Sequence, residues 1–178
     1  MRQDFIYQTQ DIPYYHNIHA QLTNFALDQT PKFRQQFNHL DLDLLRINCP
    51  LIIEWFHTQN LTPEICALIQ FPPGSDHRGT HTDTTPNYLA LNFGIKNLHS
   101  TYTAFYRMAA GAKATIKTLP NGRPYNCYSS VQLQEIGRVD LVKPTWINTH
   151  VPHAVHNLTE DVRISLSFRF KQNPWHMI

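Results

Sequence analysis

The spacing of hydrophobic residues is helical in the first 60 residues. In the stretch HNIHAQLTNFALDQ (16–29), Ile18, Leu22, Phe25 and Ala26 recur at intervals of four, three and one. This spacing places them on one side of a helix, so one face can pack against a core. The pattern predicts an amphipathic helix here.

Two more helices are expected before residue 61. Thr30 is a suitable N-cap residue, and Pro31 fits the first position of a helix. Phe33, Phe37 and Leu40 then follow at helical spacing. We therefore expect a helix over residues 30–40. A third helix is expected in PLIIEWFHTQN, with a proline at its start.

From residue 61 the pattern changes to short runs of β-branched and aromatic residues. Proline- and glycine-containing turns such as PPGSD, AAGAK and LPNGRP separate these runs. Strands are predicted at Ile65–Phe71, Tyr88–Ile95, Tyr102–Arg107, Ala114–Thr118, Val131–Ile136, Thr145–Asn148, Ala154–Asn157 and Val162–Phe170.

The last of these strands alternates most clearly. One face carries only apolar side chains, and the other carries Arg163, Ser165, Ser167 and Arg169. Many short strands after a helical start are typical of a β-sandwich or jelly roll. We expect a mainly β, single domain over 1–178, with helical support from 1–60 and a β core over 61–178.

Composition and charge narrow the function. The chain has 178 residues, 42% of them hydrophobic, and a net charge of +2 without any run of lysine or arginine. We therefore expect no nucleic-acid partner. No apolar run approaches the length of a membrane span, and the N-terminus lacks the pattern of a signal peptide, so we expect a cytoplasmic protein without membrane contact.

Three cysteines lie far apart, at Cys49, Cys66 and Cys127, and no CxxC pair occurs. The odd number argues against a disulfide scaffold, and the spacing argues against a thiolate zinc site. We interpret them as free thiols in a reducing cytosol.

Histidine and aspartate suggest a metal site. His81 and Asp83 are two residues apart, so on a strand both side chains point to the same side. Two histidines and one carboxylate form the facial triad of non-haem Fe(II) oxygenases. An HxD sequence also arises by chance, and in a loop it can cap a turn, so the pair depends on a distant third ligand.

His153 is the best third ligand. It lies ten residues before Arg163, with the turn NLTED between them. Two adjacent antiparallel strands joined by this turn would bring both residues to one cavity. An arginine there suits a carboxylate, because its planar fork forms two parallel hydrogen bonds. Ser165 lies on the same face of the strand.

With these residues, two stretches resemble a known family. The stretches ALIQFPPGSDHRGTHTDTTPNYLALNFGI (67–95) and PTWINTHVPHAVHNLTEDVRISLSFRF (144–170) resemble Fe(II)- and 2-oxoglutarate-dependent dioxygenases. The nearest branch contains the aspartyl/asparaginyl β-hydroxylases and the free-proline hydroxylases. In that branch a histidine is followed by an asparagine four residues on and an arginine ten on, here His153, Asn157 and Arg163.

The resemblance implies a double-stranded β-helix fold, also described as cupin-like. It implies Fe(II) held by His81, Asp83 and His153, with O2 and 2-oxoglutarate as co-substrates and Arg163 and Ser165 binding 2-oxoglutarate. The implied reaction hydroxylates an amino acid, a peptidyl residue or a small metabolite, and releases succinate and CO2.

The sequence also departs from this branch. Some members lack the carboxylate ligand, whereas Asp83 is present here, as in the free-proline hydroxylases. Some carry a basic pair for the near carboxylate of 2-oxoglutarate, where this chain has Ala90 and Asn92. Asn92 keeps part of that role in our interpretation. The long interval between His81 and His153 predicts an extra hairpin or lid within 111–137.

The remaining candidates are interpreted by their context. His150 precedes Pro152 and is expected in a turn, and His156 is an odd step from His153, so it should face away from the metal. We expect Asn157 to fix the turn after its strand. Surface or structural roles are expected for His57, His77 and His99, and weak substrate contacts for Tyr88, Arg107 and Trp146.

Two other classes of function remain open at this point. A cupin-like metalloenzyme that does not use 2-oxoglutarate would share the β fold and the ligands but leave the Arg163 spacing unused. A non-catalytic jelly-roll binding module would explain the fold with chance histidines. The sequence leaves the substrate and the oligomeric state undecided.

Overall fold

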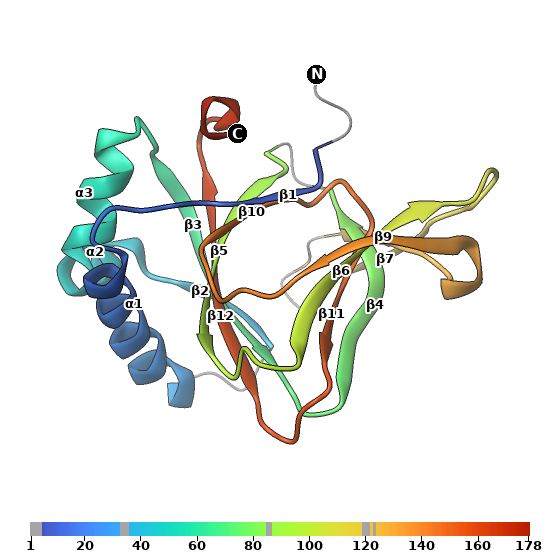
Figure 1. Ribbon diagram of the computed structural model, residues 1–178, viewed down its shortest axis with the longest axis horizontal. Helices are drawn as coiled ribbons and strands as arrows, with labels where there is room; N and C mark the ends of the chain where they lie inside the picture. The colour runs from blue at the N-terminus through green and yellow to red at the C-terminus, as the bar shows by residue number, and fades with distance from the viewer. Residues whose placement is uncertain (1–4, 33–35, 85–86, 119–121, 123) are drawn as a thin grey trace.

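Two antiparallel sheets face each other, and helices cover the outer side of one of them (Figure 1). The structure is a computed structural model that describes residues 5–32, 36–84, 87–118, 122 and 124–178. This is the mainly β jelly roll, or cupin-like double-stranded β-helix, that the sequence predicts.

The first sheet, sheet A, has six strands. In spatial order they are β1 (Tyr7–Thr9), β10 (Thr145–Asn148), β5 (Leu89–Lys96), β12 (Arg163–Phe170), β3 (Pro63–Phe71) and β2 (Phe37–Leu40). β12 lies near the middle, paired with β3 on one side and β5 on the other.

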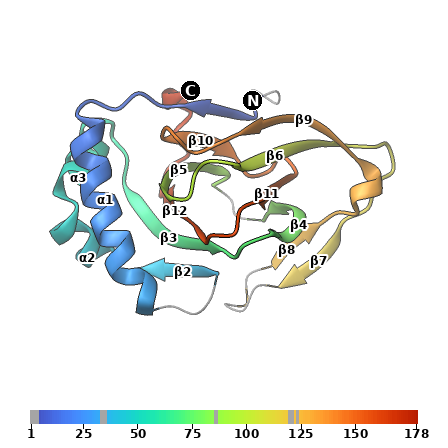
Figure 2. The ribbon, with the colours of Figure 1, turned by 60° about the horizontal axis from the view of Figure 1, so that its bottom comes forward.

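The second sheet, sheet B, also has six strands. In spatial order they are β7 (Thr115–Thr118), β8 (Pro124–Cys127), β4 (Ser75–Asp83), β11 (His153–Asn157), β6 (Thr101–Met108) and β9 (Leu133–Val139). β7 and β8 form a hairpin within 111–137, which confirms the extra hairpin expected there. Figure 2 shows this hairpin and the edge strand β2 on the same side of the molecule.

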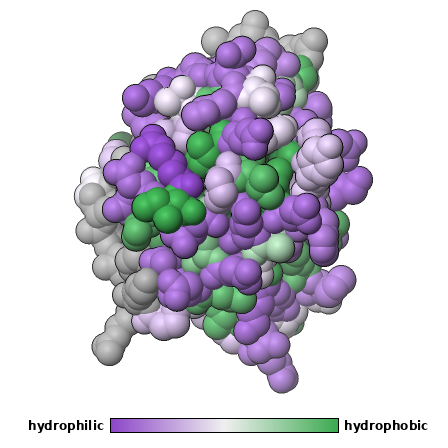
Figure 3. All heavy atoms as spheres, turned by 90° about the vertical axis from the view of Figure 1, so that its left-hand side faces the viewer, coloured by the Kyte–Doolittle hydropathy of each residue, from purple (hydrophilic) through white to green (hydrophobic). Residues whose placement is uncertain are grey.

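Three helices pack on the outer face of sheet A: α1 (Tyr15–Gln29), α2 (Leu42–Asn48) and α3 (Pro50–Thr58). The Asp41 carboxylate caps α2 by accepting hydrogen bonds from two backbone N–H groups. Figure 3 shows this helical face, which is mainly hydrophilic with scattered apolar patches. Among the helices of the described residues, none is long and apolar enough to cross a membrane. Within the described residues, short 3-10 helices also form at Thr30–Lys32, Ser130–Gln132 and Trp175–Met177.

The alternation along β12 divides the interior into two parts. Leu166, Phe168 and Phe170 face the helices and are fully buried, and the Phe56 ring of α3 packs edge-on against both phenylalanine rings. The opposite face of β12 points toward sheet B. Its four polar side chains, from Arg163 to Arg169, line the space between the two sheets.

The expected helix over 30–40 is wrong. Only Thr30–Lys32 forms a 3-10 turn, residues 33–35 lie outside the described residues, and Phe37–Leu40 is strand β2. The strand forms because residues 37–40 pair with β3, and such pairing overrides a weak local helix preference. The 1–60 region therefore contributes the edge strands β1 and β2 as well as helices.

Two polar strands lie outside the predicted strand ranges, although β8 belongs to the hairpin expected within 111–137. β4 and β8 contain few β-branched residues, and their sequences SDHRGTHTD and PYNC lack the alternation of a half-buried strand. His77, expected in a loop or helix, lies within β4. The predicted strand Val131–Ile136 begins later, because Ser130–Gln132 forms a 3-10 helix and β9 starts at Leu133.

Candidate metal centre and its cavity

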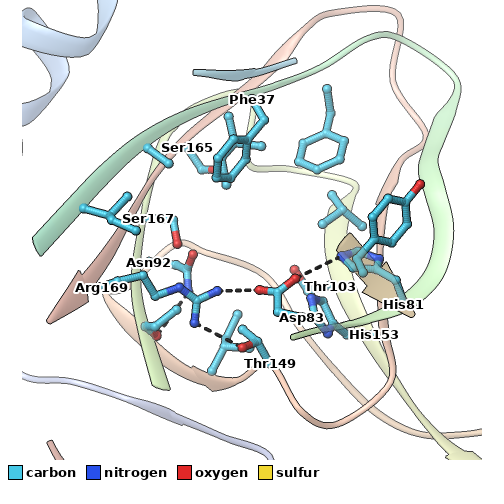
Figure 4. Close-up of a pocket in the computed structure, with 18 of the residues that line it drawn as sticks. Phe37, His81, Asp83, Asn92, Thr103, Thr149, His153, Ser165, Ser167 and Arg169 are labelled. Carbon is cyan, nitrogen blue, oxygen red and sulfur yellow. Dashed lines mark hydrogen bonds and ion pairs between the residues drawn. The ribbon is translucent and has the colours of Figure 1, made fainter. Parts of the chain in front are cut away.

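A cavity of about 1070 Å³, its open mouth included, lies between the two sheets. Strands of both sheets contribute side chains to it (Figure 4). Sheet A lines it with the polar face of β12 and with side chains from β2, β3, β5 and β10, and sheet B contributes from β4, β6, β8 and β11.

His81, Asp83 and His153 come together in this cavity. Each offers one ligand atom, and these atoms all lie within 4.8 Å of one another. His81 and His153 are direct partners on the neighbouring strands β4 and β11, with ring centroids 4.4 Å apart. The strand period of two brings Asp83 to the same side as His81. The structure thus assembles the three expected ligands.

Backbone carbonyls orient both imidazole rings. The Nδ1 of His81 lies 3.1 Å from the Gly79 carbonyl oxygen, and the Nδ1 of His153 lies 2.9 Å from that of Val151. Because a carbonyl only accepts, each Nδ1 carries the proton and donates. Each Nε2 then keeps its lone pair for a metal, which is the arrangement that metal-ligating histidines commonly show.

Asp83 is held by an arginine. Its Oδ2 lies 2.6 Å from the Nη2 of Arg169, while its Oδ1 lies 3.9 Å from the Nε2 of His81 (Figure 4). The Nη1 of Arg169 donates to the Thr149 hydroxyl at 3.1 Å. The sequence places Arg169 on the same strand face as Arg163 but indicates no partner for it. Its even spacing from Arg163 along β12 was the signal that it faces the cavity.

Arg163 is a buried cation in the same cavity. Its side chain is 1% exposed, and its Nε and Nη1 atoms have no hydrogen-bond partner among the described residues. The guanidinium lies over the Phe71 ring, 5.6 Å from the centroid. Burial lowers the pKa of Arg163 to about 10. Burial of a charge without a partner costs free energy, and an anionic ligand at Arg163 would offset that cost.

The expected hairpin between His153 and Arg163 is wrong. β11 pairs with β4 and β6 in sheet B, whereas β12 pairs with β3 and β5 in sheet A. The turn between them crosses from one sheet to the other, so the two residues reach one cavity from opposite walls. Asn157 fixes this crossing: its amide donates to the carbonyls of Phe71, Pro72 and Asp161.

The polar residues expected beside Arg163 also line the cavity. Ser165 is 2% exposed and follows Arg163 on the same face of β12. Asn92 on β5 lies opposite Ser167, and its amide donates to the Ala90 carbonyl at 3.2 Å. These side chains place hydroxyl and amide groups along the wall between the two arginines.

The other histidines of the third-ligand segment lie off the cavity. The His156 ring stacks on Tyr102, and its Nε2 lies 3.1 Å from the Tyr106 hydroxyl, so it faces away from the metal centre as predicted. His150 is exposed in the preceding turn and stacks on Tyr88. His57 and His99 are exposed, as expected for surface residues.

The three weak substrate contacts are not brought to the cavity. Trp146 is fully buried in the helix-side core, where its indole N–H donates to Gln10. Tyr88 packs between His150 and Trp175, and Arg107 is exposed on β6. Instead, Tyr125 of β8 lies edge-on to His81 at 5.8 Å, and the ring of Phe105 on β6 lies 6.3 Å from that of His153.

No protein-family model and no curated protein matches the chain. Among solved structures, similarity is found to a Pseudomonas putida prolyl-4-hydroxylase, with 15% identity, coverage of 93% of this chain and 91% of that chain, and a TM-score of 0.48. The apo form of the non-heme monooxygenase ThoJ shows 12% identity, coverage of 92% and 71%, and a TM-score of 0.42.

A variant of Bacillus subtilis oxalate decarboxylase shows 16% identity and a TM-score of 0.38 over 83% of this chain. The chain spans only 29% of the length of that protein. At these identities and TM-scores, the likenesses assign no activity to this chain, and the case for function depends on the cavity itself.

Proposed function

We propose that this protein is an Fe(II)- and 2-oxoglutarate-dependent oxygenase that hydroxylates a small molecule or a peptidyl residue. The observation that carries the proposal is Arg163, a buried guanidinium with two unpartnered nitrogens in the cavity that holds the His-Asp-His cluster. A metal site and a carboxylate receptor in one cavity fit a metal-chelating dicarboxylate.

The ligand set fits iron. Two neutral imidazole nitrogens and one carboxylate oxygen form the donor set of non-haem Fe(II) oxygenases. In this chain His81, Asp83 and His153 would hold the ion. When bound, the iron supplies the redox chemistry by which O2 is reduced, 2-oxoglutarate is converted to succinate and CO2, and the substrate is hydroxylated.

Arg163 fits the far carboxylate of 2-oxoglutarate. Its fork offers parallel N–H donors, and the Ser165 hydroxyl lies two residues along the same face. Arg163 belongs to sheet A and the three ligands belong to sheet B, so a dicarboxylate would bridge the two walls. Asn92 and Ser167 line the wall between them and would contact its middle or its near carboxylate.

The rest of the cavity favours an uncharged substrate group. Its wall includes Ile65, Ile69 and Phe71 of β3, Phe37 of β2 and Tyr125 of β8. Apolar walls exclude water and accept hydrocarbon more readily than charge. We therefore propose that an apolar portion of the substrate enters beside the metal, between β2 and β8.

A cupin-like metalloenzyme that does not use 2-oxoglutarate would leave the Arg163 guanidinium without a function, and a non-catalytic module would leave the oriented imidazoles without one. The test is anaerobic loading with Fe(II), followed by O2 and 2-oxoglutarate with succinate as the readout. Succinate formation that requires both iron and 2-oxoglutarate supports the proposal. Iron binding without any 2-oxoglutarate binding would reject it.

Two variants assign the roles. Asp83→Ala should weaken Fe(II) binding in a folded protein, since it removes the anionic ligand. Arg163→Lys keeps the charge but loses the fork, so 2-oxoglutarate affinity should fall roughly ten- to a hundredfold while iron binding barely changes. Arg46→Lys, on the exposed surface of α2, is the matched control and should alter neither.

A further inference from the structure

We propose that Arg169 is a positioning residue that makes Asp83 present a single oxygen to the metal. The proposal rests on the metal centre described above and deepens the proposed function. The two carboxylate oxygens of Asp83 have different partners: Oδ2 lies 2.6 Å from the Nη2 of Arg169, and Oδ1 lies 3.9 Å from the Nε2 of His81. Arg169 therefore holds Oδ2, whereas Oδ1 is the oxygen that lies toward the His81 imidazole.

Arg169 is itself held in place. Its Nη1 donates to the Thr149 hydroxyl at 3.1 Å, and that hydroxyl donates to the Tyr88 carbonyl at 3.0 Å. The Thr149 carbonyl also accepts the Asp83 backbone N–H at 3.0 Å. One residue thus ties the guanidinium and the backbone of its carboxylate partner together, so the ion pair has a fixed geometry.

The burial of this pair makes it stronger than a surface pair. The side chains of Arg169 and Asp83 are 14% and 23% exposed, whereas those of the Arg46–Asp43 pair on α2 are 52% and 81% exposed. Exposed pairs contribute little because water screens them, and a partly buried, charge-assisted hydrogen bond at 2.6 Å is screened less. Freeing Oδ2 from Arg169 therefore has a real cost.

A single-oxygen carboxylate keeps the metal accessible. With one ligand atom from each of His81, Asp83 and His153, a bound Fe(II) would keep positions open for 2-oxoglutarate and O2. A carboxylate that used both oxygens would occupy one of those positions. Arg169 also offsets the charge of Asp83. It therefore weakens the attraction between the carboxylate and the metal cation, while it keeps a coordination position open.

This argument predicts an unusual pair of effects. Arg169→Gln removes the cation and releases Oδ2, so Co(II), used as a redox-stable probe, should bind at least as tightly as to the wild type. The Co(II)-loaded variant should nevertheless bind 2-oxoglutarate more weakly, by roughly ten- to a hundredfold, which is the scale on which replacing the partners of metal ligands changes metal affinity or activity. Its Co(II) d–d absorption should change, because the coordination changes.

Arg169→Lys is the conservative variant. Its ammonium can still contact Oδ2, so it should restore most of the 2-oxoglutarate affinity and the wild-type spectrum, and it keeps the test valid if Arg169→Gln does not fold. Arg46→Gln removes an ion pair far from the cavity and should match the wild type in both measurements.

A double variant separates positioning from direct contact. At saturating Co(II), Arg169→Gln should have no further effect on 2-oxoglutarate affinity in an Asp83→Ala background. An additive loss would mean that Arg169 touches 2-oxoglutarate itself and would overturn the proposal. It would also be overturned by an unchanged Co(II) spectrum, or by loss of Co(II) binding in folded Arg169→Gln. If the wild type binds no 2-oxoglutarate, the proposed function fails, but the spectra still test the role of Arg169.

Discussion

The Arg163 side chain combines a stability cost with a binding capacity. It is almost fully buried, two of its nitrogens lack partners, and burial lowers its pKa to about 10. The nearby Phe71 ring compensates only in part, since cation–π contacts contribute about 0.5–2 kcal/mol. Without a ligand, the protein carries a desolvated charge.

Replacement of this cation should therefore stabilise the ligand-free protein. Arg163→Met fills similar space without charge, and a buried unsatisfied polar group costs about 1–3 kcal/mol, so we expect the free energy of unfolding to rise by about 1 kcal/mol. Urea unfolding measures this, and the same variant should lose 2-oxoglutarate binding. A less stable Arg163→Met protein would contradict the idea that the guanidinium awaits an anion.

The three histidines of residues 150–156 should behave differently when each is changed to alanine. Only His153→Ala removes a ligand, so only this variant should lose Fe(II) binding, measured by anaerobic titration. His156→Ala should retain iron and lose about 1 kcal/mol of stability, because it breaks the contacts with Tyr102 and Tyr106. His150→Ala should be the mildest. Iron loss in His156→Ala would refute the assigned face of β11.

At the scale of single residues, the sequence was informative where the two-residue period of a β-strand decides which side chains share a face. That rule was enough to predict that His81 joins Asp83, that His156 turns away from His153, and that Ser165 joins Arg163. The partnership of Arg169 with Asp83 was beyond it, because the two residues belong to different sheets. Spacing along one strand carries no information about what faces it across a cavity.

At the scale of elements, β12 was the most predictable and β4 the least. β12 has a strict alternation because one face packs on helices and the other lines the cavity. β4 carries two of the candidate metal ligands and mostly polar residues, so it lacks the apolar pattern by which strands are recognised. β2 was predicted as a helix because its phenylalanine and leucine happen to fit helical spacing.

The crossing between β11 and β12 depends on one amide. The Asn157 side chain is fully buried, donates to the carbonyls of Phe71, Pro72 and Asp161, and accepts from Thr159. It thus joins the end of β3 in sheet A to the turn that leaves sheet B.

Asn157→Asp should test this joint. A carboxylate in place of the amide would face three carbonyl oxygens and donate nothing, so we expect a loss of about 3 kcal/mol in the free energy of unfolding. The control is Asn48→Asp on the exposed end of α2, where the side-chain amide donates one hydrogen bond to the Leu44 carbonyl. Loss of this hydrogen bond should cost under about 1 kcal/mol in the same urea titration. Equal losses would show that Asn157 is an ordinary turn residue.

At the scale of the whole molecule, the two sheets contribute different groups to the cavity. Sheet B supplies the three candidate metal ligands, and sheet A supplies Arg163 and Arg169. In the described structure, the Asp83–Arg169 pair and the Asn157 amide connect these walls by side-chain contacts. A metal-bound dicarboxylate that reached Arg163 would add another connection, so ligand binding should stabilise the domain as a unit.

Thermal unfolding under anaerobic conditions should show this coupling. At a 2-oxoglutarate concentration one hundredfold above its Kd, binding adds about 2.7 kcal/mol, which raises the Tm of a domain of this size by roughly 5–10 °C. The rise should be larger with Fe(II) present than without it, because the metal and Arg163 then hold opposite ends of one ligand. Arg163→Met should keep the increment from Fe(II) and lose the increment from 2-oxoglutarate, whereas Arg46→Lys should keep both. A 2-oxoglutarate increment that survives in Arg163→Met would mean that the ligand binds on the metal side only and does not link the two sheets.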